Sequence, residues 1–442
     1  MDALVVELDR SGGVPLGAQL SAQVRLLVTG GVLSPGERLP SSRALARELG
    51  VARSVTEHAY AQLVAEGWLE GRAGSGTYVA VSGPAAAPPR RARPPAPADP
   101  PLLRLDAGTP WIDPRHRAAW RRAWREAGAA TPPRGYDDPR GIPELRAALA
   151  ARLARGRGLD VDPDDVLVTG GTTDGLRHLV TALPPGDVAM EDPGYRAAVE
   201  TVRASGRRVV DVPALALPRA DLHAVAAAYV TPAHQHPLGA TMSGGDRLAL
   251  LEAARAGGAV VVEDDYDSEF RYDVAPIPAL ASLDRDRVAY LGTASKSVAP
   301  SLRLGWLVAP GALRERVERH RDRTHDAVSW PVQRAYLALL RDGYVDRVVR
   351  SARRTYAERA ERVAAALAPY VEGPVAGMYA TVVLPRELAG SAHRAARRAG
   401  FDVPLLADYC RTAELHGLIV GFGGCTDAEL DAALAVLARA LA

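Results

Sequence analysis

Asparagine is absent from this 442-residue chain, and lysine occurs only once, as Lys296 in the stretch LGTASKSVAPSLRLGW. Lysine and arginine together number 54, so 53 of them are arginines. Arginine stays protonated in proteins, whereas lysine can lose its proton and form Schiff bases with aldehydes. By composition alone, the single lysine could be a residue without a functional role that a bias toward arginine happened to leave unchanged. The residues around it must therefore decide its role.

Cysteines and long apolar runs are also scarce. Cys410 and Cys425 form no CxxC pair and no disulfide framework. No apolar run approaches the roughly 18 residues of a membrane span, and the start, MDALVVELDR, lacks the pattern of a signal peptide. These absences predict a cytoplasmic protein without a membrane partner. The net charge of +2 is too small to indicate nucleic-acid binding, so any DNA contact must come from a local patch.

Residues 82–101 divide the chain, because SGPAAAPPRRARPPAPADPP contains eight prolines and is typical of an extended linker. The segment before it, residues 1–81, has one helical pattern in PLGAQLSAQVRLLVTG and two more in LPSSRALARELGVARSVTEHAYAQLVAEG. Ser41 or Ser42 is the expected N-cap of the second helix, and Gly50 its end. The glycine-turned hairpin WLEGRAGSGTYVA follows. Helix, helix-turn-helix and β-wing, in this order, predict a winged helix-turn-helix DNA-binding domain.

The segment after the linker, residues 102–442, alternates strands and helices. The strand candidates are DVLVTG, DVAMED, RRVVDV, AAYVTP, AVVVEDD, RVAYLGT and LGWLVAP. Nearly continuous apolar strands separated by helices predict an α/β fold with a mainly parallel, doubly wound sheet, which binds ligands at the carboxyl ends of its strands. Beyond residue 345 a long helix, two short strands and a final helix predict a small C-terminal subdomain.

Three of the strand ends carry polar residues that suit one kind of ligand. TGGTTDG opens a helix with small and hydroxylated residues, VVVEDDYDSEF places carboxylates after an apolar strand, and GTASKSVAPSLRLG holds the lysine. A plain strand-to-helix turn and an ordinary salt bridge remain alternatives for the first two. Together, however, an amine, an anion, hydroxyls and an arginine are what an aldehyde cofactor bearing a phosphate requires.

The long segment resembles the fold type I aminotransferases that bind pyridoxal 5'-phosphate (PLP), and residues 14–80 resemble the winged helix of GntR-type regulators. Joined in this order, they resemble the MocR subfamily of bacterial transcription regulators. The motifs that carry the resemblance are PGERLPSSRALARELGVARS, YVTPAHQHPLGATMS, EDDYDSEFRY and GTASKSVAPSLRLG. The resemblance implies a regulator that binds PLP, an operator in double-stranded DNA and a second copy of itself.

The resemblance also implies roles for individual residues. Lys296 would carry the internal aldimine, Asp264 would pair with the pyridinium nitrogen, Tyr266 would lie near the phenolic oxygen, and Tyr195 would stack on the ring. Tyr136 would reach the phosphate bound by the neighbouring subunit, which makes a homodimer the natural state. The residues expected to hold the phosphate or to supply hydroxyls near it are Gly171, Thr172, Thr293, Ser295 and Arg303.

Two departures from ordinary aminotransferases favour a regulator over an enzyme. His236 stands where those enzymes place an asparagine against the phenolic oxygen. The arginine that holds a substrate carboxylate has only a loose candidate, Arg411, although His416 lies closer to the last strand. Without that arginine PLP itself becomes a plausible signal. His234 and His236 could alternatively form a metal pair, but no third ligand is evident and no metal is expected.

The resemblance places the DNA-contacting residues in the helix-turn-helix and the wing: Arg43, Arg53, Ser54, Arg72 and Gly74. Between residues 34 and 60 four arginines face three glutamates, so a monomer should bind weakly and a dimer should need paired half-sites. Linker arginines 90, 91 and 93 could add phosphate contacts.

The sequence therefore predicts a PLP-dependent transcriptional regulator that senses PLP itself, an amine or an amino acid through an aldimine at Lys296. An active aminotransferase with an appended DNA-binding domain is the main alternative, although at most residual transaminase activity is expected. A plain repressor whose second domain only dimerises is the third hypothesis.

Overall fold

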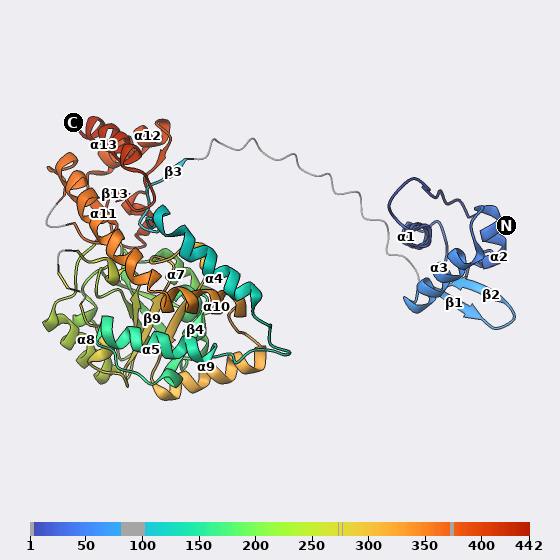
Figure 1. The fold of residues 1–442 in the computed structure, drawn as a ribbon, viewed down its shortest axis with the longest axis horizontal. Helices are drawn as coiled ribbons and strands as arrows, with labels where there is room; N and C mark the ends of the chain where they lie inside the picture. The colour runs from blue at the N-terminus through green and yellow to red at the C-terminus, as the bar shows by residue number, and fades with distance from the viewer. Residues whose placement is uncertain (1–3, 81–101, 273, 276, 372–374) are drawn as a thin grey trace. The chain divides into compact units, whose positions relative to one another are not determined.

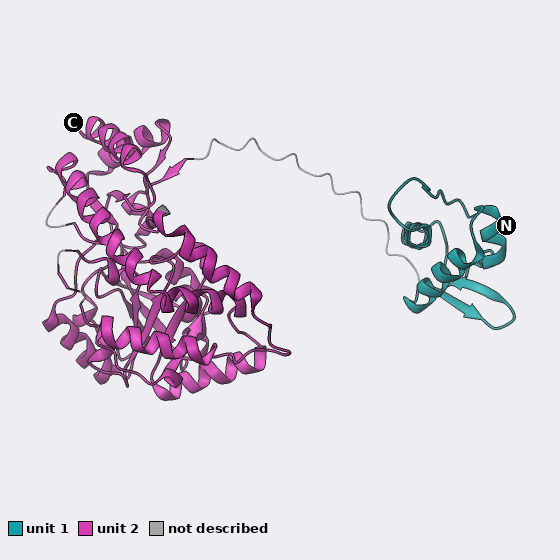
Figure 2. Cartoon of the chain, viewed as in Figure 1, with its two compact units in different colours: residues 1–98 teal, residues 99–442 magenta. Residues whose placement is uncertain are grey.

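A computed structural model describes residues 4–80, 102–272, 274–275, 277–371 and 375–442 of the chain. The chain divides into two compact units, residues 1–98 and 99–442, which Figure 2 colours separately. Each unit is described by itself. The proline-rich segment 82–101, with its three arginines, lies outside the described residues.

Unit 1 is the helix-turn-helix and wing that the sequence predicts. Its elements are α1 (Leu16–Thr29), α2 (Ser42–Glu48), α3 (Arg53–Ala65), β1 (Leu69–Arg72) and β2 (Gly76–Val79). The Oγ of Ser41 accepts a hydrogen bond from the Ala44 amide at 3.2 Å and so caps α2. Leu20, Val24 and Leu63 are fully buried where the helices meet, which holds α3 in place and leaves its outer face to solvent.

All seven strands predicted for the large unit are present. They are β4 (Val166–Thr169), β5 (Asp187–Asp192), β6 (Val209–Pro213), β7 (Val225–Val230), β8 (Val260–Asp265), β9 (Val288–Thr293) and β10 (Gly305–Val308). Their order in the sheet is β4-β10-β9-β8-β7-β5-β6, and only β10 is antiparallel to its neighbours. A parallel partner needs a crossover of about a dozen residues or more, usually a helix. Because residues 294–304 contain no α-helix, β10 turns back beside β9.

Helices cover both faces of this sheet, which explains why its strands are apolar on both sides. On β8, Val261 belongs to one hydrophobic cluster and Val262 to the other. Residues of α6 (Thr172–Ala182), α7 (Arg196–Ala204) and α9 (Gly311–Thr324) fill the second cluster. The first cluster includes residues of α5 (Pro143–Arg157), α8 (Gly244–Gly257) and α10 (Trp330–Arg341), against which α4 (Arg117–Ala129) packs.

The C-terminal elements gather at one end of unit 2 (Figure 1). They are α11 (Tyr344–Ala366), β11 (Tyr379–Val383), α12 (Arg386–Arg398), β12 (Phe401–Asp402), β13 (Gly417–Gly421) and α13 (Asp427–Leu441). The sequence predicts α11, β11, β13 and α13 but not α12. The short strand β3 (Leu103–Arg104) pairs with β12 and brings the start of unit 2 to this end. None of the described helices is long and apolar enough to span a membrane.

Candidate functional site

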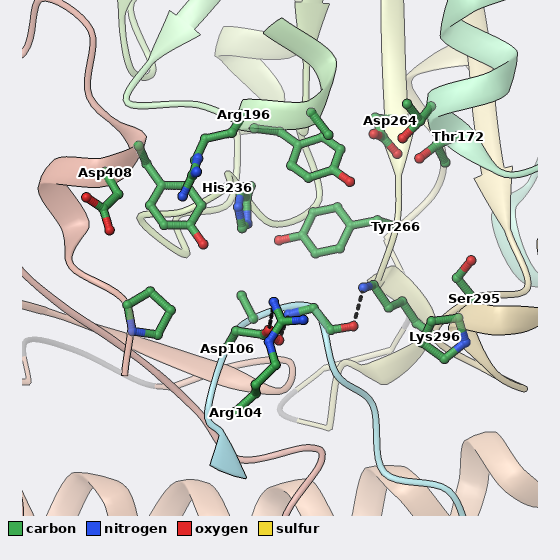
Figure 3. Close-up of a pocket in the computed structure, with 18 of the residues that line it drawn as sticks. Arg104, Asp106, Thr172, Arg196, His236, Asp264, Tyr266, Ser295, Lys296 and Asp408 are labelled. Atoms are coloured by element: carbon green, nitrogen blue, oxygen red, sulfur yellow. Dashed lines mark hydrogen bonds and ion pairs between the residues drawn. The ribbon is translucent and has the colours of Figure 1, made fainter. Parts of the chain in front are cut away.

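A cavity of about 870 Å³ opens at the carboxyl ends of the parallel strands (Figure 3). Such crevices are where open α/β sheets bind ligands. Nine of the residues singled out in the sequence line it: Thr172, Tyr195, His236, Asp264, Tyr266, Thr293, Ser295, Lys296 and Arg303. The fold therefore collects them from five segments that are far apart in the chain.

Lys296 follows β9 and projects into the cavity. Its Nζ donates a hydrogen bond to the carbonyl oxygen of Gly108 at 2.5 Å (Figure 3). Burial lowers the pKa of the Lys296 ammonium, although the carboxylates of Asp106, Asp267 and Asp264 act in the opposite direction. The neutral amine is the nucleophilic form, so burial prepares this side chain to react with an aldehyde.

Asp264 lies near the end of β8 and is 3% exposed. Its Oδ2 accepts a hydrogen bond from the Tyr229 hydroxyl at 2.5 Å, while its buried Oδ1 has no hydrogen-bond partner among the described residues. Burial raises the pKa of the Asp264 carboxyl to about 7. A buried carboxylate oxygen without a partner is costly, and a protonated ring nitrogen in the cavity would satisfy it.

The start of α6 forms a corner suited to an anion. Gly171, the N-cap of α6, has φ 111° and offers no side-chain cap to the first amides of the helix. A Cβ placed on Gly171 would lie 3.6 Å from Nη1 of Arg303, so the guanidinium adjoins this backbone. Thr293 and Ser295 add hydroxyls that hydrogen-bond to each other at 3.0 Å. Free helix amides, a guanidinium and hydroxyls are the donors that bind phosphate.

His236 is enclosed by tyrosine rings. The centroids of the Tyr195, Tyr266, Tyr379 and Tyr409 rings lie 5.3–5.7 Å from that of its imidazole. Burial lowers the pKa of His236 to about 3, so the ring is neutral at ordinary pH. His234, in contrast, places Nδ1 2.5 Å from Oδ2 of Asp267. Both histidines of the HxH motif thus contact the rings of Tyr266 and Tyr379, but of the two only His234 has a carboxylate partner among the described residues.

Tyr136 and Arg411 do not line the cavity. Tyr136 is 83% exposed and stacks on His325, with ring centroids 4.4 Å apart. Arg411 places Nε 2.5 Å from Oδ1 of Asp211 and donates to the carbonyl oxygen of Glu191 at 2.8 Å. The guanidinium of Arg411 is thus held by groups of the protein itself.

In unit 1 the residues assigned to DNA contact are exposed. Arg53 and Ser54 begin α3, where Arg53 pairs with Glu57 at 2.6 Å. Arg72 pairs with Glu70 at 2.6 Å and places its Cζ 4.5 Å from the centroid of the Tyr78 ring. Arg43 lies in the first turn of α2, and Gly74 takes φ 70° between the two strands of the hairpin.

Several cavity residues were not anticipated from the sequence, because they lie in no recognisable motif. Arg104 ends β3 and is followed by Asp106 and Gly108, whereas Arg397 and Tyr409 come from the C-terminal subdomain. The pairing of β3 with β12 brings these segments together. Each of these strands is only two residues long and so has no clear pattern in the sequence.

Comparison with known proteins agrees with both units. Residues 100–436 match the family described as aminotransferase class I and II, and residues 16–79 match the family of bacterial regulatory proteins, gntR family. The chain belongs to the class I and II aminotransferase family, whose members depend on PLP, and carries a GntR helix-turn-helix domain before it.

Relatives with both parts are transcriptional regulators. The chain is 34% identical over 453 residues to the HTH-type pyridoxine biosynthesis transcriptional regulator PdxR of Corynebacterium glutamicum, covering 99% of this chain and 98% of that protein. It is also 34% identical to the probable rhizopine catabolism regulatory protein MocR of Rhizobium meliloti, covering 94% and 92%. The chain is accordingly an HTH-type transcriptional regulator of the MocR type.

The solved structures that resemble unit 2 are aminotransferases. An archaeal alanine:glyoxylate aminotransferase is 26% identical with a TM-score of 0.67, covering 76% of this chain and 90% of its own. A variant of the aspartate aminotransferase of Thermus thermophilus is 25% identical with a TM-score of 0.67, covering 77% and 97%. The mixed sheet and its helices are thus those of the fold type I aminotransferases.

Proposed function

We propose that this regulator binds PLP at Lys296 and that the bound cofactor, alone or together with an amine, alters its binding to operator DNA. The observation that carries the proposal is the combination of groups in one cavity. A desolvated lysine, a buried carboxylate with one oxygen free, and an anion-binding corner at the start of α6 all line it. These groups fit the aldehyde, the ring nitrogen and the phosphate of PLP.

Bound PLP supplies an aldehyde that condenses with a primary amine. Lys296 would provide that amine in the protein, and Asp264 would hold the ring nitrogen through its Oδ1. Arg303, with the Gly171 backbone and the hydroxyls of Thr293 and Ser295, would hold the phosphate. Tyr195 would pack against the ring, and the neutral His236 would offer a ring N–H to the phenolic oxygen, in place of an asparagine amide.

The homodimer then contacts the two half-sites of the operator through its two copies of unit 1. The start of α3 reaches bases and phosphates through Arg53 and Ser54, while Arg72 and Gly74 place the wing against the DNA. Tyr136 supports the homodimer, because a tyrosine 83% exposed in the loop between α4 and α5 is available to a partner subunit. A cytoplasmic location follows from the need to reach DNA in a bacterial cell.

The similarity to aminotransferases favours a second candidate, an enzyme that also binds DNA. The lysine, the carboxylate and the phosphate corner would serve turnover equally well. The ion pair between Arg411 and Asp211 argues against an enzyme, because it occupies the arginine expected to bind the carboxylate of a keto acid. Conversion of an amino donor and a keto acid at ordinary enzymatic rates would favour the enzyme.

The test combines spectroscopy with DNA binding on the full chain. PLP is added, the absorption band of the cofactor is recorded, and the product is reduced with borohydride and analysed by peptide mass spectrometry. We expect reduction to fix the cofactor on Lys296, and the affinity for operator DNA to change with PLP in the wild type but not in Lys296→Ala. A cofactor that attaches elsewhere, or DNA binding indifferent to PLP and to amines, would contradict the proposal.

A further inference from the structure

His234 and Asp267 form a buried pair beside the cavity. Nδ1 of His234 lies 2.5 Å from Oδ2 of Asp267, and both side chains are only 2% exposed. Neither residue lines the cavity, and the proposed function gives neither a role. A buried carboxylate is costly unless it is paired and hydrogen-bonded. Among the described residues no arginine pairs with Asp267, so His234 is the group that holds this carboxylate in the interior.

The turn before β11 packs directly against the pair. A Cβ placed on Gly377, which has φ 68°, would lie 2.8 Å from Oδ2 of Asp267 and 2.9 Å from Cε1 of His234. The backbone therefore approaches both side chains more closely than a residue with a Cβ would permit. Two residues later, the ring centroid of Tyr379 lies 4.9 Å from that of His234. The imidazole is thus held between Asp267 and the start of β11.

The hydroxyl of Tyr266 is fixed by the same group of residues. It donates a hydrogen bond to the carbonyl oxygen of His234 at 3.0 Å and lies 2.9 Å from the hydroxyl of Tyr379. It also lies 3.3 Å from Nδ1 of His234, the atom that contacts Asp267. Tyr266 lines the cavity between His236 and Lys296 (Figure 3). The place of this hydroxyl in the cavity wall therefore depends on how Asp267 holds His234.

Asp267 also carries a charge that acts on the cavity. Burial lowers the pKa of Lys296, and the carboxylates of Asp106, Asp267 and Asp264 act against this effect. Asp106 pairs with Arg104 at 2.7 Å, so its charge is already offset by a cation. Burial raises the pKa of Asp264 to about 7, so that carboxyl is largely neutral at lower pH. Asp267 has only an imidazole as partner, which donates a hydrogen bond without adding charge when it is neutral.

The other titratable groups near the pair are uncharged at ordinary pH. Burial raises the pKa of the hydroxyls of Tyr266, Tyr379 and Tyr356, and the carboxylate of Asp267 raises each of them further. Burial lowers the pKa of His236 to about 3. Tyr266 therefore keeps the proton that it can donate in a hydrogen bond.

We propose that Asp267, held by His234, is a positioning residue for the cofactor: it fixes the hydroxyl of Tyr266 and supplies a negative charge that acts on Lys296. This inference rests on the proposed function for its cofactor. The pair itself belongs to the protein without ligand, so one part of the test needs no PLP. The first histidine of the HxH motif thereby gains a role other than metal binding.

The first experiment uses the cofactor-free, full-length protein and its single lysine. Reductive methylation with ¹³C-formaldehyde labels the amine of Lys296 and the α-amino group, and ¹³C NMR follows each of them with pH. We expect the midpoint of Lys296 to lie at lower pH in Asp267→Asn than in the wild type, because asparagine keeps the hydrogen-bond acceptor but removes the charge. Asp221→Asn is the matched control: exposed Asp221 lies 2.7 Å from Nδ1 of His223, away from the cavity, and the midpoint should not change.

The second experiment is a double-mutant cycle for PLP affinity, measured by cofactor absorption. Asp267→Ala should weaken binding by about three- to tenfold, as the loss of a hydrogen bond allows. In a Tyr266→Phe background the same substitution should weaken binding no further, because the hydroxyl through which Asp267 acts is already absent. Asp267→Asn keeps the acceptor and should bind PLP more tightly than Asp267→Ala. Circular dichroism establishes that each variant is folded.

An unchanged Lys296 midpoint in Asp267→Asn would overturn the proposal, and this result decides it even if Asp267→Ala does not fold. Equal losses of PLP affinity from Asp267→Ala in both backgrounds would also overturn it, since a purely structural role predicts them. With PLP still attached to Lys296, either result would leave the proposed function intact. A wild type without a cofactor band would overturn both.

Discussion

Substitution of Asp264 by asparagine should make the protein more stable and a poorer binder of PLP. The change is nearly isosteric, and an asparagine oxygen can still accept the hydrogen bond from Tyr229. It removes a carboxyl whose pKa is raised by burial from 3.8 to about 7. It also removes the charge that a protonated ring nitrogen would pair with. Stability and cofactor affinity should therefore move in opposite directions.

The size and pH dependence of the stability gain follow from this pKa. Below about pH 4 the carboxyl is protonated in both folded and unfolded chains, so wild type and Asp264→Asn should differ little. Between pH 3.8 and about pH 7 this carboxyl is ionised in the unfolded chain but still protonated in the folded one. The free energy of unfolding of the wild type therefore falls by roughly 1.4 kcal/mol for each pH unit. Above pH 7 the loss levels off, and the upper limit of the advantage of the variant is about 4 kcal/mol.

The assay is urea unfolding of the cofactor-free protein between pH 5 and pH 8, followed by tryptophan fluorescence. Five of the six tryptophans lie beyond residue 101 and report on unit 2. Asp322→Asn, at an exposed position of α9, is the control and should change the free energy of unfolding by less than about 0.5 kcal/mol. An Asp264→Asn variant no more stable than wild type at pH 8, or one with undiminished PLP affinity, would refute the reasoning.

Three other perturbations test separate parts of the molecule. Lys296→Arg keeps the positive charge but should abolish borohydride-stable attachment of PLP; an effector response that survives it would show that the Schiff base is not the sensing chemistry. Gly171→Ala should weaken PLP binding about tenfold in equilibrium dialysis, because a φ of 111° strains any residue with a Cβ by about 1–3 kcal/mol. An unchanged dissociation constant would contradict the assignment of the phosphate to the start of α6. Arg43→Ala should lower operator affinity in fluorescence anisotropy and reduce the slope of log affinity against log salt by about 1, whereas an unaltered slope would exclude a phosphate contact.

The sequence was sufficient to predict the elements whose signal is local. Each of the seven strands is a short apolar run, and each run keeps its character because helices bury both faces of the sheet. The direction of β10 could have been derived as well, since residues 294–304 are too few to hold a crossover helix. Lys296, Asp264 and Thr293 were assigned from motifs at strand ends, where the topology of a parallel sheet brings side chains to one edge.

The outer half of the cavity could not be predicted in this way, and Arg411 shows why. An arginine before the last strand has the right place in the chain, yet the ion pair with Asp211 depends on β6, some 200 residues earlier. In a chain with 53 arginines, charge alone identifies no binding residue. The partner of each arginine is decided by tertiary structure. Whether Arg411 can hold a substrate carboxylate is therefore a property of the folded protein, in which Asp211 and the carbonyl oxygen of Glu191 already hold its guanidinium.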